Sequence, residues 1–70
     1  MPIVIAPKDV ELNVVKVVAD DKTKKHLQSL GLVVGTKLKV ISSNGGNTIV
    51  VVKGVRLALN RDVASKILVA

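Results

Sequence analysis

The chain has 70 residues, a formal net charge of +6 and 49% hydrophobic residues, with no cysteine and no aromatic side chain. At this length it forms one domain, residues 1–70, which leaves no room for a second lobe or a deep catalytic cleft. Without cysteine, disulfides and thiolate zinc sites are excluded, so a core rich in valine and isoleucine must stabilise the fold, and these residues favour a sheet.

The first part of the chain predicts a strand followed by a helix. The strand runs from Glu11 to Val18, and its alternation of polar and apolar residues slips at Val14-Val15, which indicates a β-bulge or burial on both faces. The helix begins at Asp20-Asp21, where a carboxylate can accept hydrogen bonds from the free N–H groups of the first turn. It extends to Leu30.

Glycines mark the end of the helix and the connection that follows it. Gly31 is expected at the left-handed position after the helix, with Leu27 and Leu32 in contact across a Schellman motif. Gly35 closes a tight connection. The alternation of polar and apolar residues then predicts a strand from Lys37 toward Ser43.

A meander of strands is predicted next. Asn44-Gly45-Gly46-Asn47 has the composition of a hairpin turn, because asparagine and glycine accept the positive φ that such turns require. The partner strand runs from Thr48 to Lys53, Gly54 breaks it, and Val55 to Leu59 forms the third strand. The structural turn positions are therefore Gly31, Gly35, Asn44, Gly45, Gly46 and Gly54.

The end of the chain predicts a short helical turn and a closing strand. Asn60 is a suitable N-cap for a turn through Arg61 to Ala64, and Ile67 to Val69 forms the last strand. The predicted fold is mainly β: a small SH3-like β-barrel of about five strands, with one α-helix between the first and second strands. Closing the sheet would remove the exposed edges that promote aggregation.

Three segments carry a resemblance to a known family. The segment Leu27-x-x-Leu30-Gly31-Leu32-x-x-Gly35, the strand from Lys37 to Ile41 and the ending Ala64-x-x-Ile67-x-Val69 resemble the FeoA family over nearly the whole chain. The resemblance implies a non-enzymatic accessory protein of bacterial ferrous-iron uptake. Its implied partner is FeoB, a membrane transporter with a cytosolic GTPase domain, bound through protein–protein contacts.

The chain also departs from the family pattern at three places. His26 stands where many relatives carry arginine, Val34 stands where proline is frequent, and Lys8-Asp9-Val10 lies where relatives tend to have a glycine turn. A domain of the same shape also occurs as the C-terminal domain of iron-dependent repressors. This leaves open an alternative function as a stand-alone regulatory or dimerisation domain, which would act in trans because the chain has no helix-turn-helix.

No pattern in the sequence predicts catalysis, a cofactor or a metal site. The stretch from Gly31 to Lys37 is one residue too short for a phosphate-binding loop and follows a helix instead of preceding one. His26 lies among lysines, which oppose metal binding, and Asp20 and Asp21 serve better as helix caps. A solvated histidine is the favoured interpretation.

Partner binding is therefore expected to depend on the surface. The predicted site is the helix, with Lys22, Lys24, Lys25, His26, Leu27 and Leu30, although the two leucines also have the spacing of core residues. Lys37, Lys39 and Lys53 lie on outward faces of adjacent strands. Three interpretations of this surface are open: it is only solvated, it binds an acidic protein, or it binds nucleic acid weakly. The absence of aromatic residues argues against nucleic-acid binding.

The expected location of the chain is the cytoplasm. The apolar run from Pro2 to Pro7 is too short for a secretory signal and lacks a preceding basic stretch, and no segment approaches the roughly 20 apolar residues of a membrane span.

Overall fold

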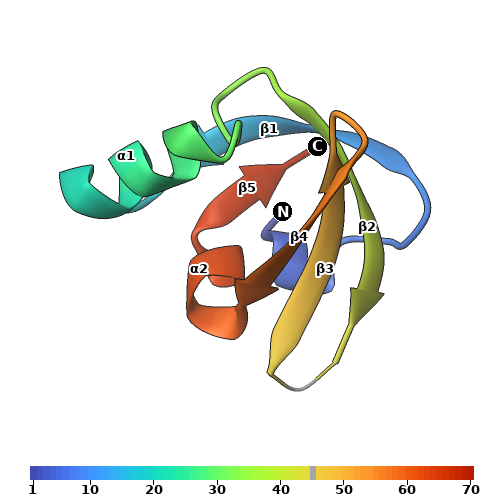
Figure 1. Cartoon of the computed structure of the whole chain (residues 1–70). Coiled ribbons are helices and arrows are strands. Elements are labelled where there is room, and N and C mark those ends of the chain that lie inside the picture. The colour runs from blue at the N-terminus through green and yellow to red at the C-terminus, as the bar shows by residue number, and fades with distance from the viewer. Residues whose placement is uncertain (45) are drawn as a thin grey trace.

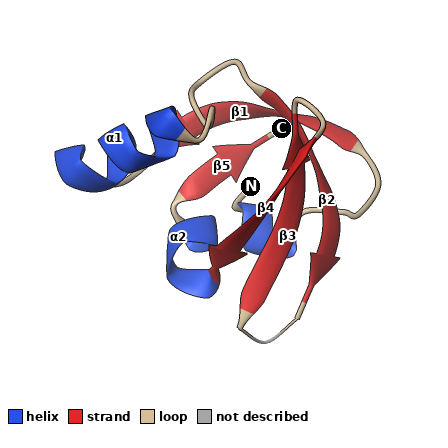
Figure 2. Cartoon of the chain, in the orientation of Figure 1, coloured by secondary structure: helices blue, strands red, loops and turns tan. Residues whose placement is uncertain are grey.

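The structure is a computed structural model that describes residues 1–44 and 46–70. Five strands form one antiparallel sheet in the order β4-β3-β2-β1-β5, as Figures 1 and 2 show. The elements in chain order are η1 (Ile3–Ile5), β1 (Glu11–Val17), α1 (Asp21–Ser29), β2 (Lys37–Ser43), β3 (Asn47–Val52), β4 (Val55–Asn60), α2 (Arg61–Ser65) and β5 (Ile67–Val69). The mainly β, SH3-like fold with one helix after the first strand is confirmed.

The strand β1 belongs to two ladders and bends between them. Glu11 to Asn13 pair with β2, whereas Val14 to Val17 pair with β5, and the register shifts between Val14 and Lys16. A bulge at this point bends the strand and increases its local twist, so one strand can serve both halves of the sheet. The slip in the sequence pattern is therefore a bulge.

Within the described residues, the sheet curls without closing into the complete barrel that the sequence predicted. Over residues 1–44 and 46–70, the end strands β4 and β5 do not pair with each other, and α2 lies between them, in contact with η1, β3, β4 and β5. The helix, in place of strand pairing, fills this side of the core.

The amino-terminal segment covers the outer edge of β5, which the sequence pattern did not predict. The Met1 ammonium donates to the Val69 carbonyl at 2.8 Å, and the Val69 N–H donates to the Met1 carbonyl at 2.7 Å. Pro2 and Leu68 form a β-bridge, and Ile3 is fully buried. The segment thus protects an edge on which another chain could otherwise add a strand.

The core is made of aliphatic side chains on the inner face of the sheet, together with one residue from each helix and Leu32 from the connection after α1. Alternate residues of β2 and β3 point inward, as the burial of Leu38, Val40, Val50 and Val52 shows. The buried hydrophobic residues are Ile3, Leu12, Val14, Leu27, Leu32, Leu38, Val40, Val50, Val52, Leu59, Ala64, Ile67 and Val69.

Several predicted boundaries differ from the structure. α1 ends at Ser29 with Leu30 as its C-cap, β4 extends to Asn60, and α2 extends to Ser65. β1 ends at Val17, one residue early, and β3 begins at Asn47, so the predicted hairpin turn loses its last residue; Gly45 lies outside the described residues. Lys53 is not in the strand but in a two-residue turn with Gly54, at φ of +53° and +79°. A two-residue hairpin requires positive φ at both positions, which overrides the strand pattern at Lys53.

Candidate functional site

The helix α1 projects from the sheet with little contact to the other elements (Figure 1). Leu27 is the only one of its nine residues that is buried, at 1% exposure. The helix is held at both ends by local hydrogen bonds instead of by extensive packing. It therefore presents most of its side chains to solvent.

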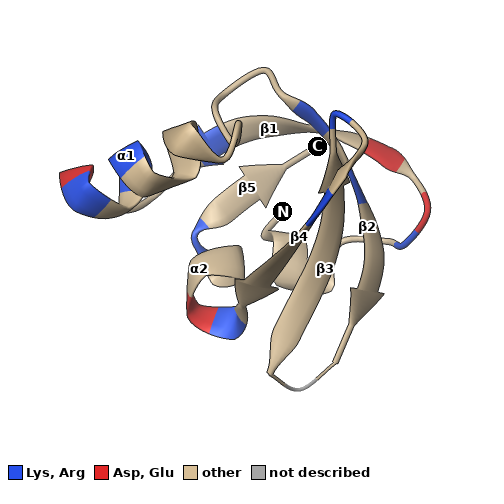
Figure 3. Cartoon of the chain, in the orientation of Figure 1, with Lys and Arg blue, Asp and Glu red and all other residues tan. Residues whose placement is uncertain are grey.

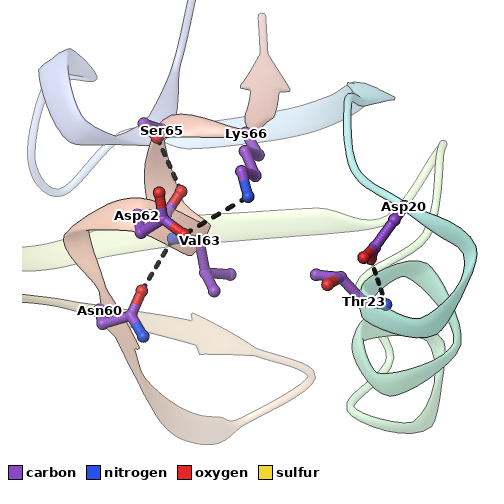
Figure 4. Close-up of polar contacts among 7 residues, drawn as sticks. All are labelled: Asp20, Thr23, Asn60, Asp62, Val63, Ser65 and Lys66. Atoms are coloured by element: carbon purple, nitrogen blue, oxygen red, sulfur yellow. Dashed lines mark hydrogen bonds and ion pairs between the residues drawn. The ribbon is translucent and has the colours of Figure 1, made fainter.

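Local chemistry fixes the beginning of α1. The Asp20 carboxylate accepts the Thr23 N–H at 2.8 Å, as in Figure 4. Hydrogen bonds from the Thr23 side chain and then from its backbone N–H lower the pKa of the Asp20 carboxyl below the ordinary value of 3.8. Asp20 thus remains a charged cap at neutral pH, as the sequence predicted.

The end of α1 is the predicted Schellman motif. The Leu32 N–H donates to the Leu27 carbonyl and the Gly31 N–H to the Gln28 carbonyl, both at 2.9 Å, with Gly31 at φ +87°. The Thr36 hydroxyl adds a bond to the Gly31 carbonyl at 3.0 Å. The stretch that resembles a phosphate loop is therefore a helix end that continues into β2.

The predicted partner-binding residues divide into two groups. Lys22, Lys24, Lys25 and His26 are exposed on α1, and Leu30 is half-buried just after it. Leu27 lies in the core with Leu32, so it cannot reach a partner while the domain is folded. Its assignment as a partner-binding residue is corrected to that of an anchor, because its spacing places it on the inner side of the helix.

A groove of about 290 Å³ runs between α1 and the second half of β1. Val15, Val33 and Val34 line it and are 40–64% exposed. The cationic side chains of Lys16 and Lys24 lie beside these valines. Sequence reasoning missed this groove, although the adjacent valines of Val14-Val15 and Val33-Val34 were a signal for it: Val14 is buried while Val15 is exposed, and Val33 and Val34 are both exposed.

A second, broader hollow of about 1010 Å³ lies on the opposite face of the sheet from the core, and we call it the outer hollow. Its lining includes Asp9, Glu11, Val33, Val34, Lys37, Lys39, Val51 and Lys53. The structure thus brings together the three lysines that the sequence placed on outward faces. Asp9, at φ +61°, forms the turn beside it where relatives were expected to have glycine.

The described residues offer no cluster for metal chemistry. Across residues 1–44 and 46–70, no three His, Cys, Asp or Glu residues come together in a way that could hold a metal ion. Among the same residues, no helix has the length and apolar character needed to cross a membrane. The arrangement provides cationic and aliphatic surfaces.

The family model and a related protein sequence indicate the same family. The model of the FeoA domain family matches residues 1–70. The chain is 37% identical over 68 residues to Fe(2+) transport protein A of Methanocaldococcus jannaschii, covering 97% of this chain and 83% of that protein.

Solved structures show the same fold. A crystal structure of an iron uptake regulatory protein (FeoA) superposes with a TM-score of 0.90 at 26% identity, covering 99% of this chain and 93% of that one. FeoA of Stenotrophomonas maltophilia in complex with zinc, described as a prokaryotic SH3 domain protein, gives 0.79 at 26% identity, with coverages of 100% and 89%. The manganese regulator SloR gives 0.86 at 17% identity, with 99% of this chain matching 33% of its length.

Proposed function

The chain belongs to the FeoA family, and from this membership we propose that it is a cytoplasmic accessory protein of ferrous-iron uptake. It acts without enzymatic activity, by binding the cytosolic portion of a FeoB-like membrane GTPase transporter. The relative named for Fe(2+) transport and the FeoA structure named for iron uptake support the pathway. The surface of the chain supports binding as the mode of action.

The single observation that carries the proposal is the projecting, cationic helix α1. Lys22, Lys24 and Lys25 are exposed on an element that contributes only Leu27 to the core. Like charges on one short helix repel each other by a few tenths of a kcal/mol per pair, so they add nothing to its stability. Their placement is instead suited to steering an acidic partner surface toward the α1–β1 groove, where Val15 and Val34 supply apolar contact.

The decisive experiment measures binding to the cytosolic portion of the transporter, with and without guanine nucleotide. We expect K24E/K25E to weaken binding about tenfold or more, because two cations of the encounter surface become anions. Ferrous-iron uptake in cells that carry this variant should fall in parallel.

A matched control makes the same change in charge elsewhere. Lys8 and Arg61 are exposed and lie outside both the groove and the outer hollow. K8E/R61E should therefore leave binding and uptake near those of the wild type. Unchanged binding and uptake in K24E/K25E would refute α1 as the docking element.

The alternative function is a regulatory or dimerisation domain that works in trans with another protein. The likeness to the manganese regulator supports a shared fold. A neighbouring gene for a large GTPase with membrane spans would favour the transporter partner, and a neighbouring gene for a DNA-binding protein would favour this alternative.

A further inference from the structure

The outer hollow lies on a face of the sheet that the core does not use. Cross-strand partners show its composition: Glu11 of β1 is opposite Lys39 of β2, Lys39 is opposite Val51 of β3, and Val51 is opposite Arg56 of β4. Partners in an antiparallel sheet share one face, and the neighbouring pairs, such as Leu38 and Val52, point into the core. One row of cross-strand partners on the outer face thus consists of Glu11, Lys39, Val51 and Arg56.

The charge of this face is uneven. Glu11 is within 3.8 Å of Lys37, at the β1 side of the hollow. Within the described part of the chain, Lys39 and Lys53 have no acidic side chain at ion-pair distance. Figure 3 shows the same polarity, with acidic segments at the start of β1 and basic ones on β2, on β4 and at the turn that joins β3 to β4. Free positive charge is therefore concentrated over β2 and the β3–β4 turn.

The walls of the hollow are aliphatic. Val33 and Val34 are 40% and 64% exposed at one side, and Val51 and Ile41 are half-buried on the sheet below. Scattered exposed valines are ordinary on a surface, but here they border a concave site with cations beside them. The site can take up an aliphatic side chain while its lysines meet carboxylates.

We propose that the outer hollow binds an extended, acidic and aliphatic peptide segment of the partner protein. An aliphatic side chain of the segment packs against Val34 and Val51, and its carboxylates meet Lys39 and Lys53. A basic residue of the segment is accommodated at the end where Glu11 lies, which sets the direction of the peptide. This inference rests on the proposed function in one respect, because it takes the ligand to be part of a protein partner.

Other occupants fit the same surface less well. Single-stranded nucleic acid binds through aromatic stacking as well as charge, and the chain has no aromatic residue. A second copy of the chain would bring two molecules of net charge +6 together. A bilayer is flat, whereas the site is concave. An acidic peptide satisfies both the charge and the shape.

The test is a selection of 12-residue peptides from a random display library on the full chain, followed by binding measurements with the synthetic forms of the enriched peptides. We expect the enriched peptides to alternate Asp or Glu with Val, Ile or Leu. Amide shifts of Val34, Lys39 and Val51 should change on binding, and affinity should fall as salt is added.

Variants then locate the site. K39E/K53E should weaken the enriched peptides at least tenfold, and V34S should weaken them severalfold, whereas K24E/K25E on α1 should change affinity less than twofold. All of these residues are exposed, so the folded state should survive the substitutions. Circular dichroism of each variant verifies this.

Several outcomes would overturn the proposal. The first is a selection that enriches no acidic peptides. The second is a set of enriched peptides that changes the amide shifts of α1 instead of those of the outer hollow. The third is tighter binding at the same amides by an oligothymidine or a phosphatidylserine vesicle than by any peptide. Failure of the transporter portion to bind the wild-type chain would refute the proposed function but leave the peptide result standing. Loss of transporter binding in K39E/K53E, with K24E/K25E unaffected, would instead place the docking at the hollow alone.

Discussion

The helices α1 and α2 begin in the same way and serve opposite purposes. At each N-terminus a side-chain oxygen accepts the N–H of the third helical residue at 2.8 Å (Figure 4). The acceptor is the Asp20 carboxylate for Thr23 in α1 and the Asn60 side-chain carbonyl for Val63 in α2. Yet α2 lies between the ends of the sheet with Ala64 fully buried, whereas α1 projects into solvent. The same kind of N-cap therefore does not determine whether a helix packs in the core or projects into solvent.

The charges of the two helices differ as well. At the C-cap of α2, Lys66 Nζ lies 3.4 Å from the carboxylate of Asp62 one turn earlier, so the charge of this element is partly neutralised. Within the described residues, the lysines of α1 have no such partner. Thus α2 completes the core, while α1 keeps its charge available to another molecule.

The largest expected effect is the loss of stability when the buried side chain that attaches α1 to the core is removed. Leu27→Ala removes the only buried side chain of this helix and leaves a cavity beside Leu32, which should lower the free energy of unfolding by about 3 kcal/mol. Urea denaturation measures this loss. Leu30→Ala, at a half-buried position, is the matched control and should cost clearly less. Equal costs for the two variants would contradict the role of Leu27 as anchor.

A second prediction concerns the way α1 ends. Gly31 has φ +87°, and an added Cβ would lie 3.8 Å from Val52 Cγ1, which is ordinary contact. Gly31→Ala should therefore cost only the backbone penalty of a left-handed residue, about 1–2 kcal/mol in unfolding free energy. Gly46→Ala, where a Cβ meets nothing within 4 Å and φ is not in the left-handed range, should be close to neutral. A neutral Gly31→Ala would contradict the Schellman account.

The third prediction concerns the N-cap of α2. Asn60→Ala removes the oxygen that accepts the Val63 N–H and should lower the unfolding free energy by about 1 kcal/mol. Because α2 fills the side of the core where the sheet does not close, this loss should appear in global unfolding. Asn60→Ser, which can restore the cap, should recover most of it. Fraying of α2 without a global change would show that its packing is less important than the structure indicates.

Local signals explain what could be predicted from the sequence. Both helix caps, the glycine stop at Gly31 and the bulge at Val14-Val15 depend on residues within a few positions of each other, and each is present in the structure. Their hydrogen-bond geometry is determined by neighbours along the chain. That is why residue type and spacing were sufficient.

Features that depend on distant residues were missed. The amino-terminal segment pairs with β5 through Met1 and Val69, 68 positions apart, and nothing in its own short run marks this. The α1–β1 groove exists because the bulge turns Val15 outward beside Val33 and Val34. The burial of Leu27 was one of two interpretations of helical spacing, and only the packing of the helix against the core decides between them.

The smallest expected effect exploits the one chemical difference between the two caps. The folded-state pKa of Asp20 is lowered by Thr23, so its contribution to stability is present above the ordinary value of 3.8 and is lost as pH falls through the lower folded value. The Thr23 amide of α1 should therefore lose protection from hydrogen exchange in strong acid. The Val63 amide of α2, capped by an uncharged asparagine, should lose less over the same range. Asp20→Asn keeps an acceptor oxygen without a titrating proton, so it should make the two helices respond alike to pH, and a Thr23 amide that still loses protection in this variant would show that the acid sensitivity of α1 arises elsewhere.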